Sequence, residues 1–106
     1  MKHETKDAGG SVVVAFEGEI DLQTSPAARE ALLAAVAQGK PVIVDLANVG
    51  YIDSSGVASL VEALQGAKKG GQALSLAAVS EGALRVLKLA RLDAVFTIHA
   101  SVDDAL

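Results

Sequence analysis

The chain has 106 residues, enough for one domain with a single hydrophobic core and too few for two. Apolar residues make up 51% of it, which excludes a disordered chain, and with only three aromatic residues the core must consist of valine, leucine, isoleucine and alanine. A net charge of −4 argues against a nucleic-acid partner, and the absence of cysteine excludes disulfides and thiolate chemistry.

The amino terminus, MKHETKDAGG, lacks the apolar segment of a signal peptide. No apolar run approaches the roughly 20 residues that a membrane span requires. We therefore expect a cytoplasmic protein that does not insert into a membrane.

The first part of the chain predicts a β-hairpin. Val12 to Phe16 is rich in β-branched residues, as strands are, and the turn-prone sequence Asp7 to Gly10 precedes it. A first strand over Lys2 to Lys6 would pair with that run. Because its side chains are nearly all polar, we expect the sheet to be short or poorly formed at this edge.

A helix is predicted from Pro26 to Gln38. Thr24 and Ser25 place a capping hydroxyl at its start, and proline tolerates the first helical position because its missing N–H would be unpaired there. Gly39 can adopt the left-handed conformation that ends a helix.

The next strand, Val42 to Leu46, is apolar without alternation, as expected of a strand that is covered on both faces. After the stretch YIDSSG (Tyr51 to Gly56), apolar residues recur every three or four positions from Val57 to Leu64, which predicts an amphipathic helix. This helix should end at Lys68 to Gly70, where two cations precede a glycine.

The remaining sequence predicts a strand over Ala73 to Val79, a helix capped by Ser80, a short strand over Val95 to Ile98 and a terminal helical turn over Ser101 to Leu106. In the helix after Ser80, three residues should face the core and three cations should stay in water. These are Leu84, Leu87 and Ala90 for the core, and Arg85, Lys88 and Arg91 for the solvent.

In chain order, these elements form a β-hairpin followed by βαβαβ. Parallel neighbours require crossover connections, which the helices supply. The sequence therefore predicts an α/β fold with a mixed, mostly parallel sheet of four to five strands, one antiparallel edge and helices packed on the sheet.

The stretch YIDSSG lies where open α/β sheets expose functional groups, between the carboxyl end of a strand and the amino end of a helix. One interpretation is a helix cap, in which Asp53 or Ser54 accepts backbone hydrogen bonds and Gly56 gives the backbone room. The other is a phosphorylated hydroxyl, because a helix amino end tolerates a phosphate. A cap requires one polar side chain only, so it leaves the second serine, Ser55, unexplained.

Two separated motifs resemble the STAS domain family, in particular its bacterial anti-sigma factor antagonists. The run VIVDLANVGYIDSSGVASL is similar to the family signature, and FEGEIDLQTSPAAREAL is similar to the segment that enters the first helix. The resemblance implies one STAS-like domain over residues 1–106. It also implies that Ser55 is phosphorylated by a partner that is both a serine kinase and an anti-sigma factor, and that Asp21 lies near Ser55 and contributes to kinase recognition. The implied partner-binding residues are Asp21, Thr24, Asp53, Ser54, Ser55 and Gly56.

The resemblance implies a charge switch. The unphosphorylated chain would dock on the kinase and release the sigma factor that the kinase holds. Phosphorylation adds a charge of about −1.5 to −2 and would weaken docking, and a phosphoserine phosphatase would reset the chain.

Other functions stay open. STAS domains also act as regulatory subunits of lipid-transporting ABC complexes, as scaffolds in stress-signalling assemblies and as tails of anion transporters, although the intact D-S-S-G favours the switch. A hydrolase would need the G-x-S-x-G motif with a positioned histidine and acid, which the sequence lacks. His3 and His99 stand alone, which argues against a metal site, and no cofactor motif occurs. We expect a monomer or a weak homodimer, since an exposed edge strand can pair with a second copy.

Overall fold

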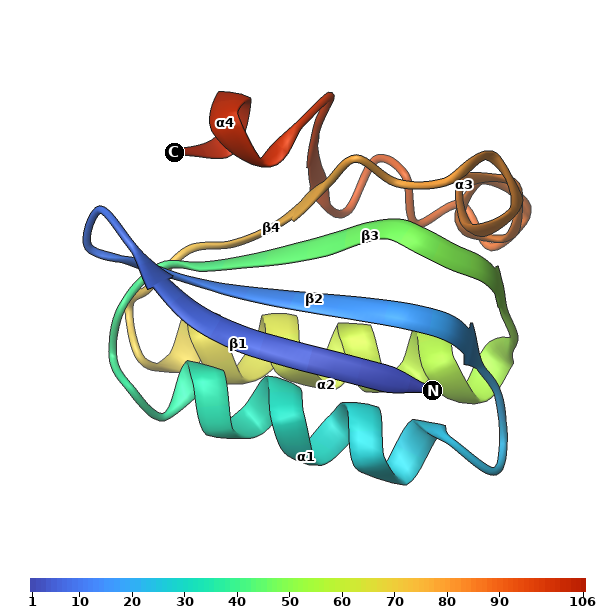
Figure 1. Cartoon of the computed structure of the whole chain (residues 1–106), viewed down its shortest axis with the longest axis horizontal. Coiled ribbons are helices and arrows are strands. Elements are labelled where there is room, and N and C mark those ends of the chain that lie inside the picture. Colours follow the sequence, from blue (N-terminus) through green and yellow to red (C-terminus); the bar gives the residue numbers. More distant parts are fainter.

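The computed structural model describes all 106 residues as a five-stranded mixed sheet with four helices (Figure 1). The sheet order is β1-β2-β3-β4-β5, in which β1 runs antiparallel to β2 and all other neighbours are parallel. The predicted fold class is therefore confirmed. In chain order the elements are β1 (Lys2–Ala8), β2 (Ser11–Ile20), α1 (Ser25–Val36), β3 (Val42–Ile52), α2 (Ser54–Lys69), β4 (Leu74–Ala77), α3 (Glu81–Leu89), β5 (Thr97–His99) and α4 (Val102–Ala105).

The opening hairpin is complete, so the expectation of a short or poorly formed edge is wrong. β1 pairs with β2 along its whole length, from Lys2 opposite Glu17 to Ala8 opposite Ser11. Gly9 and Gly10 have φ angles of 58° and 88°, and a tight two-residue turn needs positive values at both positions. Backbone pairing with β2 thus holds a strand whose side chains are mostly polar and exposed.

Strand β3 is longer than predicted, because it continues beyond Leu46 to Ile52. It carries one extra residue relative to β2 at each of two irregularities, opposite Ala15–Glu17 and opposite Gly18–Glu19. Such bulges break the period of two, and they allow Leu46, Val49 and Ile52 all to be buried although they are spaced three apart. The polar segment before Asp53 is therefore strand.

The helices cover the two faces of the sheet unequally. Helices α1 and α2 lie side by side on one face and α4 lies on the other (Figure 1). The main core lies under α1 and α2, and its largest side chains include Phe16, Ile20, Leu32, Leu46, Ile52 and Leu60. A second, small cluster of Val13, Ile43 and Ala77 lies against Val102 and Ala105 of α4. None of the helices has both the length and the hydrophobicity to cross a membrane.

Helix α3 packs against β3, and Gly82 of α3 lies next to Gly50 of β3. A Cβ atom added to Gly82 would lie only 2.5 Å from the Gly50 carbonyl oxygen. The Ser80 cap is confirmed, because its hydroxyl accepts a hydrogen bond from the Ala83 N–H. The buried residues of α3 are Ala83 and Leu87, and Leu84 is half-buried. Ala90 is exposed, contrary to the prediction, because the helix ends one residue earlier. The three cations, Arg85, Lys88 and Arg91, are exposed as predicted.

The last two strands differ from their predicted bounds. β4 ends at Ala77 because Ala78 has a φ of 52°, which no strand accommodates. β5 begins at Thr97, since Val95 instead belongs to a turn in which its N–H donates to the Leu92 carbonyl. The terminal helical turn is present as α4.

Candidate functional site

Two turns meet at the carboxyl edge of the sheet, because β2 and β3 are parallel neighbours whose last residues, Ile20 and Ile52, lie opposite each other. One turn leads from β2 to α1 and the other from β3 to α2. The Asp53 N–H donates to the Ile20 carbonyl oxygen at 3.1 Å, and the Leu22 N–H donates to Asp53 Oδ2 at 3.1 Å. The two turns therefore form one hydrogen-bonded unit.

Asp53 is the amino-terminal cap of α2. Its Oδ1 accepts hydrogen bonds from the N–H groups of Ser55 at 2.9 Å and Gly56 at 3.2 Å. This confirms a helix cap and assigns it to Asp53, whereas Ser54 is exposed. The two carboxylate oxygens of Asp53 have different partners. Oδ1 caps α2, and Oδ2 accepts a hydrogen bond from the Leu22 N–H in the neighbouring turn.

Asp21 organises the turn that follows β2. Its Oδ1 accepts hydrogen bonds from the N–H groups of Gln23 and Thr24, each at 3.0 Å. Hydrogen bonds, first of all the one from the Thr24 backbone, hold the pKa of Asp21 below its usual value. The Asp21 carboxylate is therefore charged at neutral pH.

Thr24 takes the cap position of α1, but its hydroxyl does not cap the helix. The hydroxyl instead accepts from the Asp21 N–H at 2.9 Å and donates to the Glu19 carbonyl oxygen at 2.8 Å. The predicted capping role is wrong, because the tight turn offers the hydroxyl nearer backbone partners. Thr24 stabilises the turn itself.

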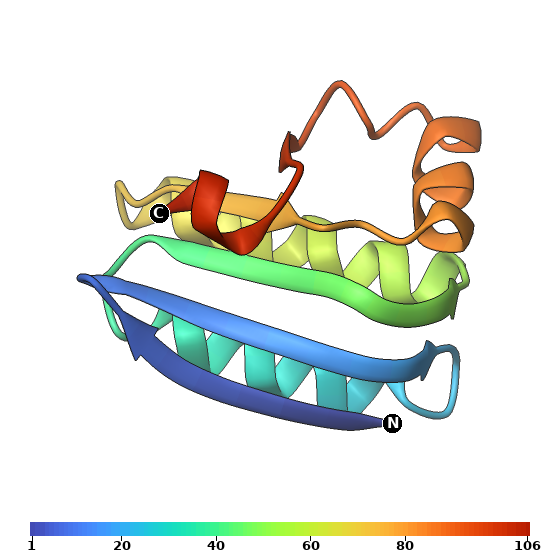
Figure 2. The ribbon, with the colours of Figure 1, turned by 45° about the horizontal axis from the view of Figure 1, so that its top comes forward.

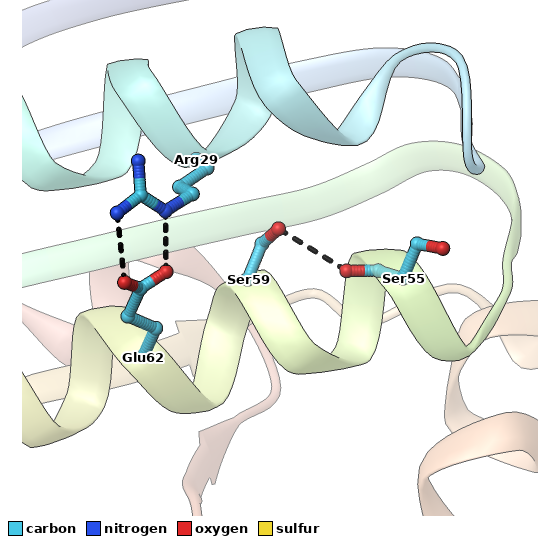
Figure 3. Close-up of polar contacts among 4 residues, drawn as sticks. All are labelled: Arg29, Ser55, Ser59 and Glu62. Atoms are coloured by element: carbon cyan, nitrogen blue, oxygen red, sulfur yellow. Dashed lines mark hydrogen bonds and ion pairs between the residues drawn. The ribbon is translucent and has the colours of Figure 1, made fainter.

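Ser55 lies in the first turn of α2, and both of its backbone polar groups are engaged. Its N–H donates to Asp53, and its carbonyl oxygen accepts the Ser59 hydroxyl at 3.1 Å. The Ser55 side chain points away from Ser59 (Figure 3) and makes no hydrogen bond within the chain. The half-buried Ser55 thus combines a fixed backbone with an uncommitted hydroxyl.

Gly56 allows α2 to start directly on the ends of the strands. A Cβ atom at this position would meet the side chain of Ile52 at 2.6 Å, and the side chain and carbonyl oxygen of Ile20 at 2.8 and 2.9 Å. Real Cβ atoms essentially never approach other atoms this closely. The prediction that Gly56 gives the backbone room is therefore confirmed.

Two exposed apolar side chains border the site, and sequence reasoning missed both. Leu22 is 75% exposed in the first turn and Tyr51 is 48% exposed just before the second. The only sequence signal for Leu22 is an apolar residue among polar turn residues. Exposed apolar groups of this kind contribute to protein interfaces.

The electrostatics of the site are acidic. Glu19 lies near the end of β2 and Asp21 and Asp53 lie in the two turns, and neither turn contains a lysine or arginine. The cation on the adjacent face of α1 is Arg29, which is paired with Glu62 of α2 at 2.5 and 2.9 Å (Figure 3). This pairing lowers the pKa of Glu62 and raises that of Arg29, mainly through their hydrogen bonds. A negative group added at Ser55 therefore finds no cation within the two turns.

Comparisons with known proteins agree with this architecture. The STAS domain model matches residues 2–105. The anti-sigma-B factor antagonist of Bacillus subtilis is 31% identical over 97 residues, which cover 92% of this chain and 89% of that protein.

Solved structures give the same result. The crystal structure of an anti-sigma factor antagonist from Mycobacterium paratuberculosis has a TM-score of 0.89 and 30% identity, and the match covers 98% of this chain and 89% of the other. The Bacillus cell fate determinant SpoIIAA in its phosphorylated form shares the fold, with a TM-score of 0.74 at 20% identity over 98% of this chain and 96% of the other.

Proposed function

The chain belongs to the STAS domain family, and from this membership we propose that it is an anti-sigma factor antagonist controlled by phosphorylation of Ser55. The observation that carries this proposal is the uncommitted Ser55 hydroxyl on a backbone fixed by Asp53 and Ser59. In this role the chain is a binding protein and the substrate of a partner serine kinase, and it acts in the cytoplasm, where sigma factors bind RNA polymerase.

In the proposed active state, unmodified Ser55 lies within the docking surface. Leu22 and Tyr51 would supply apolar contacts, and the acidic turns would meet basic groups of the kinase/anti-sigma factor. The kinase would be occupied by this chain and would release its sigma factor. The names of two relatives, an anti-sigma-B factor antagonist and an anti-sigma factor antagonist, support an anti-sigma factor as the partner.

In the proposed inactive state, the kinase has transferred a phosphoryl group from ATP to Ser55. The bond between the Ser55 oxygen and phosphorus forms as the bond to ADP breaks, and a base on the kinase takes the hydroxyl proton. The added charge of about −1.5 to −2 then lies beside Asp53, which already occupies the N–H groups of Ser55 and Gly56. Docking requires this surface to lose water, so the extra charge weakens it. A phosphoserine phosphatase would restore the active state.

Ser54 and Ser59 provide matched controls for the choice of Ser55. Ser59 is 6% exposed and its hydroxyl already donates to the Ser55 carbonyl, so a kinase cannot reach it without opening α2. Ser54 is exposed and lies one residue earlier in the same turn. The choice of Ser55 over Ser54 rests on the resemblance to the STAS family, and only Ser55 is expected to become phosphorylated.

The first test is mass spectrometry with fragment mapping on chain purified from its native cells, beside Ser55→Ala and Ser54→Ala variants. We expect one phosphoryl group on the wild type and on Ser54→Ala, and none on Ser55→Ala. The second test measures binding of the co-purified kinase to both forms, where phosphorylation should weaken affinity at least ten-fold. An unmodified Ser55 in growth and in stress would refute the switch, and an ABC transporter subunit as the recovered partner would favour the regulatory-subunit function.

A further inference from the structure

The outer edge of β1 presents an unpaired row of backbone donors and acceptors. β1 is the first strand in the sheet order, and Figure 2 shows it as the outermost strand on its side, with α1 behind the hairpin. Residues Lys2 to Asp7 are all exposed, and the strand contains no proline, glycine or bulge. The opposite edge strand, β5, has only three residues. Lys2 and Lys6 are edge charges of the kind that oppose strand addition, so a partner strand must set acids opposite them. β1 is the longer edge at which such a strand can be added.

The turn geometry decides which backbone groups of β1 face outward. A two-residue turn makes its flanking residues, Ala8 and Ser11, a hydrogen-bonded pair, and such pairs alternate along an antiparallel ladder. Lys6, Glu4 and Lys2 therefore bond to β2. The N–H and C=O groups of the alternate residues, His3, Thr5 and Asp7, point away from the sheet.

The charges of β1 complement each other when the strand meets an antiparallel copy of itself centred on Thr5. In this register Glu4 lies opposite Lys6 of the second copy, and Lys6 lies opposite Glu4 of the second copy. Both are non-hydrogen-bonded pairs, in which cross-strand side chains lie closest. His3 lies opposite Asp7 of the second copy, so no like charges meet.

The neighbouring registers with the same backbone pattern are unfavourable. Centring the pair on Glu4 sets Glu4 against Glu4 and Lys2 against Lys6, and centring it on Lys6 sets Lys6 against Lys6. Like charges directly opposite each other destabilise a strand pair. Among the registers centred on Glu4, Thr5 and Lys6, only the one centred on Thr5 sets no like charges opposite each other. A register centred on His3 also sets Lys2 opposite Glu4, but it pairs fewer residues of β1.

We propose that β1 is a homodimerisation edge, at which two copies of this chain pair antiparallel about a two-fold axis through Thr5 and join their sheets. The occupant is a second copy of the chain, because the charge pattern of β1 complements itself in the register centred on Thr5. The pairing involves one strand from each copy, so the dimer is weak and depends on concentration. Pairing through β1 leaves Asp53 and Ser55 uncovered, because both residues follow β3 and not the edge strand.

A charge-swap series tests the proposal. Glu4→Lys and Lys6→Glu each set like charges opposite each other, whereas the double variant Glu4→Lys/Lys6→Glu restores both pairs with the signs reversed. Both side chains are exposed, so neither change touches the core. Sedimentation velocity over a range of concentrations should show a wild-type dimer, at least ten-fold weaker dimers for the single variants and recovery in the double variant.

Mixing the two single variants gives a sharper result, because Glu4→Lys chains and Lys6→Glu chains are complementary to each other and repel themselves. We expect the equimolar mixture to dimerise more strongly than either variant alone. Wild-type chain that stays monomeric at all concentrations, or single variants that dimerise as well as the double variant, would overturn the proposal. Ser55 phosphorylation should be the same in all variants, so failure here is distinguishable from failure of the proposed function.

The register is tested with single cysteines, since the chain contains no other cysteine. Thr5 faces its own copy across the axis at a hydrogen-bonded pair, where Cα atoms are about 5.5 Å apart, within the range of a disulfide. Oxidised Thr5→Cys should form a covalent dimer, whereas His3→Cys, displaced from the axis, should not. A His3→Cys dimer without a Thr5→Cys dimer would refute the proposed register.

Discussion

Replacing Gly56 by alanine should destabilise the protein, although alanine normally favours helix formation. The added methyl would lie 2.6 Å from Ile52 Cγ1, 2.8 Å from Ile20 Cγ2 and 2.9 Å from the Ile20 carbonyl oxygen. Two of these atoms belong to side chains that are 0% and 1% exposed. The third is a backbone atom that accepts the Asp53 N–H, so it cannot move without pulling the two turns apart.

The expected loss follows from three terms. Overpacking of a close-packed core costs about 1–3 kcal/mol. A weakened hydrogen bond between Asp53 and Ile20 adds about 1 kcal/mol. The helix propensity of alanine returns at most about 1 kcal/mol, so the net decrease in the free energy of unfolding is about 1–3 kcal/mol.

Urea denaturation of Gly56→Ala beside Gly66→Ala measures this loss. Gly66 lies in the same helix, but a Cβ atom there has Val36 Cγ1 at 3.7 Å as its nearest neighbour, which is an ordinary contact. Gly66→Ala should therefore raise the free energy of unfolding by up to about 1 kcal/mol. Equal stability of the two variants would refute the close approach of α2 to β2 and β3.

Three further predictions concern the polar contacts. Asp53→Ala should lower the free energy of unfolding, measured by urea denaturation, by about 1–3 kcal/mol, because it removes the helix cap and the hydrogen bond from the Leu22 N–H together. Asp53→Asn keeps one acceptor oxygen and should therefore lose less stability. Glu62→Gln should leave the free energy of unfolding nearly unchanged, because the ion pair with Arg29 is exposed and screened by solvent. A clear loss would show that the pair clamps α1 to α2. The pKa of Asp21 is lowered in the folded chain, so its contribution to stability is present above its unfolded pKa and is lost as the pH falls through the folded pKa. An NMR titration should find the Asp21 midpoint below 3.8, and Asp21→Asn should flatten the acid limb of the stability profile.

The order of elements was predictable because the hydrophobic period changes at each boundary. Strands with continuous apolar runs alternate with segments of helical period, and local signals mark the turns, as at Gly9 and Gly10 and at Ser80. The capping role of Asp53 could also be predicted from the sequence, since a cap bonds to N–H groups only two and three residues away.

Features that depend on partners distant in sequence were not predictable. The extension of β3 to Ile52 relies on two bulges opposite β2, and the single-sequence pattern contains no trace of that pairing. The bond from Leu22 N–H to Asp53 joins residues 31 positions apart. The prediction for α3 was wrong for a more local reason. Leu87 is buried as predicted, but Ala83 is buried instead of Leu84, and Ala90 is exposed because the helix ends at Leu89.

The contacts around Ser55 bear on how a switch at this residue would work. Its N–H and C=O are bound by Asp53 and Ser59, and its hydroxyl holds no other group in place. A phosphoryl group on that hydroxyl would therefore break no hydrogen bond of the fold, and Asp53 would keep α2 capped. The modification then acts on the charge of the surface rather than on its shape, because the two turns supply acids and no cation to neutralise it. A partner that binds this surface would therefore distinguish the two phosphorylation states by their surface charge. The fold itself would be the same in both states.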